Sequence, residues 1–112
     1  MPVSPVAADS SVLIAFQEIG HLALLQVLFQ EIVVPPAVAR EVTPSLAKLP
    51  GWIAEVQPFS IHPAARILDA GEQEAMSLAM EISATSVLLD DLPAMRCAEE
   101  LCLSVIGSVG ML

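Results

Sequence analysis

Acidic and hydroxyl side chains follow three short apolar runs of this sequence. Asp9 follows the run VAA, Asp90 and Asp91 follow VLL, and Ser108 follows VIG. In open α/β sheets, ligand sites lie beyond the carboxyl ends of the strands. If the three runs are parallel strands, these groups converge at one edge of the sheet, with no lysine or arginine among them.

Two glutamates at the start of a helical pattern are further candidates. In residues 71–82 the apolar positions form one stripe, and Glu72 and Glu74 fall on its two opposite edges, so either one could lean over the sheet. Asp69-x-x-Glu72 also resembles a capping arrangement, and acids suit the first turn of a helix. Glu72 therefore has a structural explanation as well as a functional one.

The chemistry that such a set of acids favours is cation binding. Carboxylates held close together repel one another, which raises their pKa values unless a cation neutralises them. Oxygen ligands without histidine or cysteine suit the hard ions Mg²⁺ and Mn²⁺. Such ions clamp phosphodiesters and generate hydroxide from bound water. The rival interpretation is helix capping by Asp90 or Asp91.

The elements that must position these acids alternate between strands and helices. We expect strands at residues 6–8, in EIVV, in SVLLD and in SVIG, and helices on both sides of a break at Gly20, from Pro36, in LDAGEQEAMSLAMEIS and in LPAMRCAEEL. The proline-rich segment between the third helix and Arg66 is predicted as a loop in which WIAEVQ is one possible edge strand. This alternation predicts an α/β fold, a three-layer α/β/α domain with a mostly parallel sheet.

Length and charge limit what this fold can do. The 112 residues form one domain, 1–112. With 4 Lys+Arg against 13 Asp+Glu, the net charge of −9 argues against binding nucleic acid by bulk electrostatic attraction. A nucleic-acid ligand would need a bridging metal or a basic partner.

The apolar content of the chain, 55%, does not predict a membrane protein. Every apolar run is interrupted before the roughly 18 residues that a spanning helix needs. The first residues, MPVSPVAADSS, lack the basic region and apolar run of a signal peptide, so we expect a cytoplasmic protein. Cys97 and Cys102 are predicted to be reduced, buried thiols, because no third ligand stands at metal-site spacing.

Four segments together resemble one known family: VAADSSVLIAF, IVVPPAVAREV, LDAGEQEAMSLAMEI and VLLDDLPAMRCAEELCLSVIGSVGML. The chain is similar to PIN-domain proteins of the VapC-like toxin ribonuclease class, in the branch with GExEA and LLDD motifs. The resemblance implies a metal-dependent nuclease with a Mg²⁺ or Mn²⁺ cofactor, an RNA substrate and an antitoxin partner. The alternative is a catalytically weak or inactive PIN-like module that binds another protein. A third interpretation, a receiver-like phosphoacceptor domain, is weaker because it requires a lysine near the last strand, and no lysine follows Lys48.

The resemblance also assigns roles to particular residues. It implies four catalytic acids: Asp9, Glu41, Glu74 and Asp91. The candidate metal ligands are Asp9, Glu74, Asp90 and Asp91, and either of the two adjacent aspartates could be the one that binds the ion. Ser10, Glu72 and Ser108 are possible supporting residues. Taken without the resemblance, Glu41 is an ordinary solvated helix residue beside Arg40.

Two features depart from the family pattern. Cys102 stands just past a helix end, where the family usually has glycine in a left-handed conformation. The chain also stops early, so we expect Val105, Ile106, Val109 and Leu112 to pack against a neighbouring subunit or to be poorly ordered. Self-association as a homodimer or higher oligomer is predicted through an apolar helix: Leu22, Leu25, Val27, Leu28 and Phe29.

Overall fold

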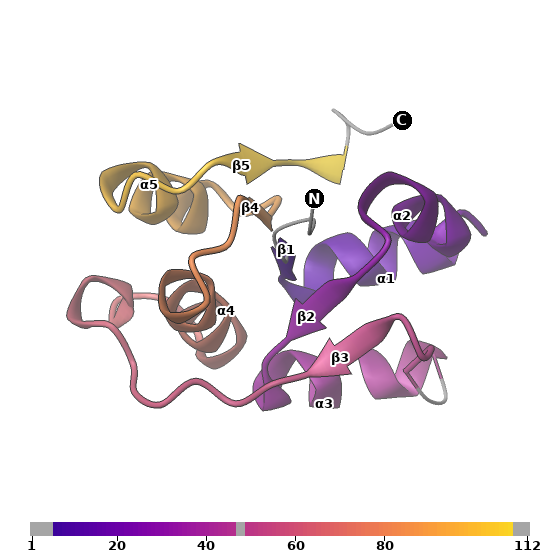
Figure 1. Ribbon diagram of the computed structural model, residues 1–112, viewed down its shortest axis with the longest axis horizontal. Coiled ribbons are helices and arrows are strands. Elements are labelled where there is room, and N and C mark those ends of the chain that lie inside the picture. Colours follow the sequence, from indigo (N-terminus) through magenta and orange to yellow (C-terminus); the bar gives the residue numbers. More distant parts are fainter. Residues whose placement is uncertain (1–5, 47–48, 109–112) are drawn as a thin grey trace.

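A five-stranded parallel sheet organises the chain (Figure 1). The computed structural model describes residues 6–46 and 49–108. The strands are β1 (Val6–Ala8), β2 (Ile32–Val34), β3 (Ile53–Glu55), β4 (Ser86–Leu88) and β5 (Val105–Ile106), in the order β3-β2-β1-β4-β5. All the pairings between neighbouring strands are parallel. The predicted α/β class with a mostly parallel sheet is confirmed.

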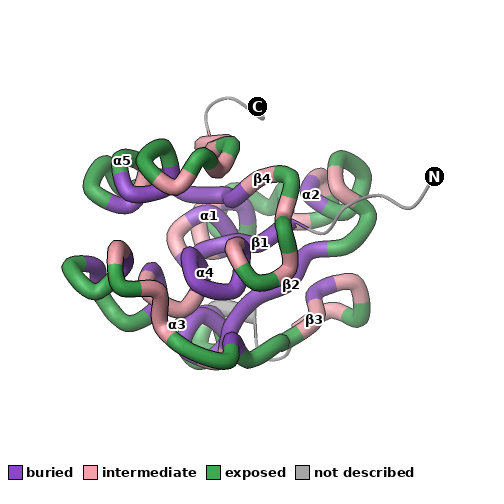
Figure 2. Tube along the Cα trace, turned by 60° about the vertical axis from the view of Figure 1, so that its left-hand side comes forward, coloured by how far each residue is buried: buried purple, intermediate pink, exposed green. Residues whose placement is uncertain are grey.

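Helices cover both faces of this sheet. They are α1 (Ser10–Glu18), α2 (Leu22–Phe29), α3 (Pro36–Leu46), α4 (Ala70–Glu81) and α5 (Leu92–Glu100), with a short 3₁₀ turn at Pro63–Ala65. Successive residues of a strand point to opposite faces, and β1 illustrates this. Val6 and Ala8 belong to the core beneath α1, α2 and α3, whereas Ala7 belongs to the core beneath α4 and α5. Figure 2 shows the buried strands between these layers.

Most element boundaries follow the local sequence signals. Gly20 has a φ of +74°, a left-handed conformation that suits glycine, and it separates α1 from α2 as predicted. The possible edge strand WIAEVQ is present as β3. One difference lies in α3, which continues to Leu46 with Pro44 inside it, whereas the proline-rich segment was expected to be a loop from Thr43 onward.

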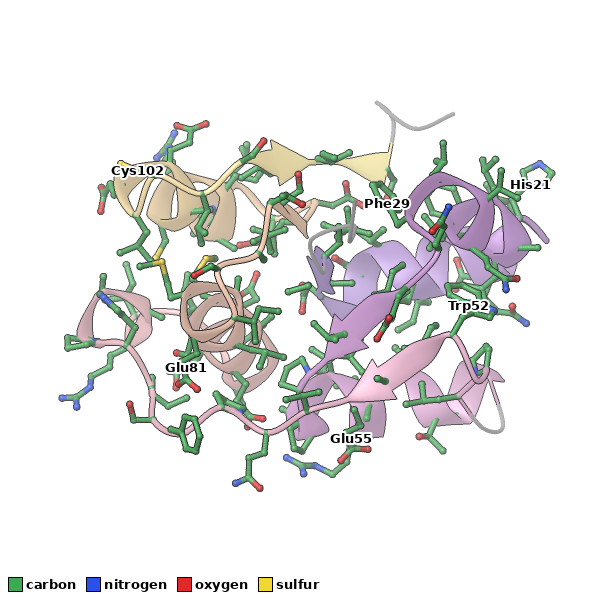
Figure 3. All side chains as sticks on the ribbon, in the orientation of Figure 1. His21, Phe29, Trp52, Glu55, Glu81 and Cys102 are labelled. Atoms are coloured by element: carbon green, nitrogen blue, oxygen red, sulfur yellow. The ribbon has the colours of Figure 1, made fainter. Side chains whose placement is uncertain are left out.

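The two cysteines differ in their surroundings. Both are free thiols, and Cys97 is buried. Cys102 is exposed, so the prediction of two buried thiols is wrong for this residue. It has a φ of +60° in the turn after α5, which confirms the expected left-handed position, and it lies at the outer edge of the molecule (Figure 3).

The surfaces predicted to meet other chains are only partly covered. On α2 Leu25 is buried, but Val27 is 76% and Leu28 47% exposed. Val105 and Ile106 are half-buried, and Val109 and Leu112 lie outside the described residues. Contact of these surfaces with another subunit stays a prediction. In the described part of the chain, no helix has the length and apolar character to cross a membrane.

Candidate functional site

An open cleft of about 400 Å³ lies at the carboxyl edge of β1 and β4. We call it the acidic cleft, because six of the residues that line it are acids and none of the lining residues is basic: Asp9, Ser10, Ser11, Glu41, Asp69, Glu72, Asp90 and Asp91. The acids follow the ends of two strands, stand at or near the start of α4, or, for Glu41, lie in the middle of α3. The structure thus brings together most of the predicted site residues.

Asp9 is the most buried acid of the acidic cleft, with 5% of its surface exposed. Its backbone N–H donates to the Leu88 carbonyl (3.0 Å), which extends the pairing of β1 with β4. Asp9 stands at the N-cap of α1, yet its carboxylate makes no capping hydrogen bond. Burial raises the pKa of Asp9 to about 6, and repulsion from Asp69 and Glu41 adds to the rise. A carboxylate that is buried and not used as a cap is well suited to bind a cation.

Two neighbouring residues, Ser10 and Gly71, determine where the Glu41 carboxylate lies in the acidic cleft. The Ser10 hydroxyl donates a hydrogen bond to its Oε2 (2.9 Å). Gly71 leaves room for the same carboxylate, because a Cβ at this position would collide with Oε1 of Glu41 and would lie 3.5 Å from Oδ1 of Asp9. Glycine at the start of α4 therefore allows α4 to pack against two acids. Gly71 is visible in the sequence, but it did not indicate a role for Glu41, which was predicted only from the resemblance to PIN domains.

Asp69 and Glu72 form the predicted capping arrangement at the start of α4. The Glu72 N–H donates to Oδ1 of Asp69 (3.0 Å), and the Asp69 N–H donates to Oε1 of Glu72 (3.4 Å). Glu72 is buried, with 6% of its surface exposed. Burial, followed by a hydrogen bond with the Asp91 carboxyl, raises the pKa of Glu72 to about 8. The capping box therefore stabilises the start of α4 and also places two acids in the acidic cleft. Asp69 was treated only as a capping residue, although its spacing from Glu72 was visible in the sequence.

Asp90 and Asp91 use their carboxylates differently. Asp90 accepts two hydrogen bonds from Ser108, from its N–H at Oδ1 (2.8 Å) and from its hydroxyl at Oδ2 (2.5 Å), and so ties the end of β5 to the end of β4. Asp91 is the N-cap of α5 and accepts from the Ala94 N–H at Oδ2 (3.2 Å). The helix-capping interpretation is correct for Asp91, but the cap occupies only one of its oxygens.

The structure does not bring Glu74 to the acidic cleft, which corrects the predicted placement of this residue. Positions two apart on a helix differ by about 200° in direction, and Glu74 lies on the side of α4 opposite to Glu72. Its Oε1 accepts the Ala37 N–H in the first turn of α3 (3.1 Å). It lines a second depression of about 430 Å³, the Phe59 groove: Pro36, Arg40, Gln57, Pro58, Phe59, Ser60, Ile61 and Glu74. The catalytic roles of Glu74 and of the other acids stay predictions.

The donor chemistry of the acidic cleft fits a hard divalent ion. Its acidic oxygens are the ligands that Mg²⁺ and Mn²⁺ prefer, and cation binding would relieve the repulsion that raises the pKa of Asp9. Within the described residues, no group of three or more acids, histidines or cysteines is gathered closely enough to hold a metal ion. Glu41, Asp69 and Asp91 are exposed side chains, and a bound ion would require their carboxylates to turn toward it from their present hydrogen bonds with Ser10, Glu72 and Ala94.

Comparison with known families decides what kind of domain this is. A family model described as PIN domain matches residues 5–112. The chain belongs to the PIN-domain family. PIN domains are typically nucleases that use divalent metals, so this is a nuclease-type fold. A search of curated proteins found no match.

Proposed function

We propose that this PIN domain is a metal-dependent endoribonuclease of the toxin–antitoxin type, which acts in the cytoplasm with Mg²⁺ or Mn²⁺. The observation that supports this proposal most strongly is the acidic cleft, in which six acids and no basic residue surround the exposed end of two parallel strands. A chain with a net charge of −9 has no bulk attraction for RNA, so a cation in this cleft would also provide the contact with the substrate phosphate.

Asp9, Asp91 and Glu41 are the residues that we expect to hold the ion. The ion would supply a Lewis acid for the phosphodiester and an activated water. Ser10 would hold the Glu41 carboxylate in place through the hydrogen bond described above. Glu72 would carry a proton that it shares with Asp91, and this proton would leave when Asp91 becomes a ligand. Asp90 would act as a positioning residue, because both of its oxygens already bind Ser108.

The proposed partners are RNA, an antitoxin protein and a second copy of this chain. The exposed apolar side chains of α2, Val27 and Leu28, support a protein partner, because each exposes about half or more of its surface. The alternative function, a PIN-like module that binds a protein without cleaving RNA, uses the same surface.

The Asp9→Asn variant tests the proposed function. A labelled single-stranded RNA is incubated with the protein in Mg²⁺, in Mn²⁺ and in EDTA, and its cleavage is followed on a denaturing gel. We expect cleavage with either metal, none in EDTA, and a loss of at least about a hundredfold in Asp9→Asn, because a ligand charge is removed without opening a core cavity.

The matched control is Glu55→Gln. Glu55 is an exposed acid at the end of the edge strand β3 (Figure 3) and does not line the acidic cleft, so this variant should cleave at the wild-type rate. Metal-dependent cleavage that survives in Asp9→Asn would contradict the assigned role. If the wild-type protein cleaves no RNA with either metal but forms a stable complex with another protein, the interaction-module alternative is correct.

A further inference from the structure

Phe59 is an almost fully exposed aromatic ring, with 98% of its surface accessible. Single exposed apolar residues are common, so exposure alone has no functional meaning. Here the backbone beneath the ring is fixed by α4. Both carboxylate oxygens of Glu81 accept the Phe59 N–H, at 2.7 and 3.0 Å, and one of them also accepts the Ser60 N–H at 3.3 Å. Figure 3 shows Glu81 on the side of α4 that faces this segment.

The rest of the segment is also anchored. At its beginning the Val56 N–H donates to the Val34 carbonyl (2.8 Å), and at its end the His62 N–H donates to the hydroxyl of the buried Ser77 (2.8 Å). Pro58, the neighbour of Phe59, is buried. The ring therefore stands on a backbone of fixed shape, so little conformational entropy is lost when a ligand stacks on it.

The Phe59 groove has one basic side chain in its lining, and the helices α3 and α4 contribute residues both to it and to the acidic cleft. Arg40, an exposed residue, lines the groove, whereas the next residue, Glu41, lines the cleft. On α4, Glu74 faces the groove and Glu72 faces the cleft. The two depressions thus lie on either side of the contact between α3 and α4. The chain has only 4 Lys+Arg, and Arg40 is the one basic side chain in the lining of this groove, so it is the group that can contact a phosphate there.

We propose that the Phe59 groove binds one nucleotide of the single-stranded RNA substrate, with its base stacked on Phe59 and its phosphate on Arg40. This proposal rests on the proposed ribonuclease function. The volume of about 430 Å³ suits a small ligand of this kind. Stacking on aromatic rings together with a basic contact to the backbone is how proteins hold single strands without sequence preference. A protein partner is the less favoured occupant, because half of the lining residues are polar or charged: Arg40, Gln57, Ser60 and Glu74.

Binding of a fluorescein-labelled single-stranded RNA of mixed sequence tests this proposal. Anisotropy is measured with Ca²⁺ in place of Mg²⁺, which keeps a hard divalent ion available to the acidic cleft, for the otherwise wild-type protein and for Phe59→Ala, Phe59→Tyr and Arg40→Gln, and a denaturing gel verifies that the RNA stays intact. Phe59→Ala should raise Kd about 5- to 150-fold, the range that aromatic stacking on one base contributes, and Phe59→Tyr should restore binding. Ile67→Ala, at another apolar side chain with 85% of its surface exposed, is the control and should leave Kd unchanged.

The salt dependence separates the two contacts. Arg40→Gln should lower the slope of log K against log salt by about 0.7, the value for one phosphate contact on a single strand, whereas Phe59→Ala should leave the slope unchanged. In the otherwise wild-type protein, Phe59→Ala should raise KM for RNA cleavage and leave kcat nearly unchanged.

Failure of this proposal and failure of the proposed function give different results. If the wild-type protein cleaves RNA but Phe59→Ala binds and cleaves it normally, the nucleotide site is wrong and the ribonuclease function stands. If RNA binds and depends on Phe59 but is never cleaved, the site stands and the catalytic function is wrong. If no RNA binds, both are wrong. Loss of a protein partner in Phe59→Ala with unchanged RNA affinity would assign the groove to that partner.

Discussion

At the scale of single residues, the same carboxylates serve folding and the candidate chemistry. Asp69 and Asp91 cap helices while they line the acidic cleft, so the backbone N–H groups at two helix starts fix these acids at the cleft. Asp9 differs, because it makes no capping hydrogen bond and its burial is not compensated by a basic residue. Without a cation, the acidic cleft costs the fold stability.

The pH dependence of stability should reveal this cost. Glu72 has a pKa of about 8 against an ordinary value of 4.5, and Asp9 about 6 against 3.8. Both carboxyls therefore bind protons more tightly in the folded protein than in the unfolded chain. Unfolding releases these protons at pH values between the ordinary pKa and the raised pKa of each group. In EDTA, we expect the free energy of unfolding to fall as the pH rises from 4.5 to about 8.

Urea unfolding across this pH range measures the effect, with Glu72→Gln as the comparison. Glutamine has the shape of the protonated acid but cannot ionise, so its stability should depend much less on pH in the upper part of the range. A wild-type protein whose stability rises from pH 4.5 to about 8 would show that the burial of Glu72 does not disfavour its charged form.

At the scale of elements, α4 contributes to two surfaces at once. Glu72 and Glu74 lie on opposite edges of its apolar stripe, as the spacing predicted, and they face the acidic cleft and the Phe59 groove respectively. Glu74 supports α3 by accepting the Ala37 N–H, one of the donors that have no partner within that helix. The helix pair α3 and α4 is thus held together by a carboxylate that was predicted to bind metal.

Substitution of the two glutamates should separate these roles. Glu74→Gln keeps an oxygen acceptor for the Ala37 N–H, so we expect wild-type stability and RNA cleavage, with at most a change in KM. Glu74→Ala removes the cap and should cost about 0.5–2 kcal/mol of stability. These values come from urea unfolding and from steady-state cleavage of the same RNA. If Glu74→Gln lowers kcat by as much as Asp9→Asn does, Glu74 acts in the reaction, and the placement described here does not represent the active protein.

The sequence predicted the positions of the helices and strands better than it predicted which side of each helix faces the site. Hydrophobic periodicity and proline placement located β1, β2, β4 and the helices, because these signals are local. Periodicity could show that Glu72 and Glu74 lie on opposite edges of α4, but not which edge faces the cleft, since that depends on how α4 packs against α3. Pro44 was expected to lie in a loop, but the helical turn continues through it to Leu46. The exposure of Cys102 likewise depends on the turn after α5, which no periodic pattern specifies.

At the scale of the whole molecule, the charge distribution is as informative as the fold. The chain carries a net charge of −9, and six of its acids line one cleft of about 400 Å³. Parallel strands and their following helices bring these acids together from positions 9 to 91 in the sequence. Asp9, Asp90 and Asp91 could be predicted because parallel strands place their carboxyl ends at one edge, whereas Glu41 was predicted only from the resemblance to PIN domains. Asp69 and the Phe59 groove were missed, because a capping residue and a loop anchored by Glu81 give no functional pattern in the sequence.

Divalent cations should therefore stabilise the whole protein, and the rise in Tm should exceed the rise that ionic screening alone produces. A ligand that binds only the folded state adds RT ln(1 + [L]/Kd) to stability, about 2.7 kcal/mol at a hundredfold excess over Kd. We expect Mg²⁺ or Mn²⁺ to raise Tm in differential scanning calorimetry in proportion to the logarithm of its concentration, and NaCl at equal ionic strength to raise it much less. Asp9→Asn should lose most of the ion-specific rise and retain the response to NaCl, while Glu55→Gln should keep both. If NaCl and MgCl₂ at equal ionic strength shift Tm equally, the acids of the cleft act as a diffuse negative surface, and the metal-dependent mechanism loses its structural support.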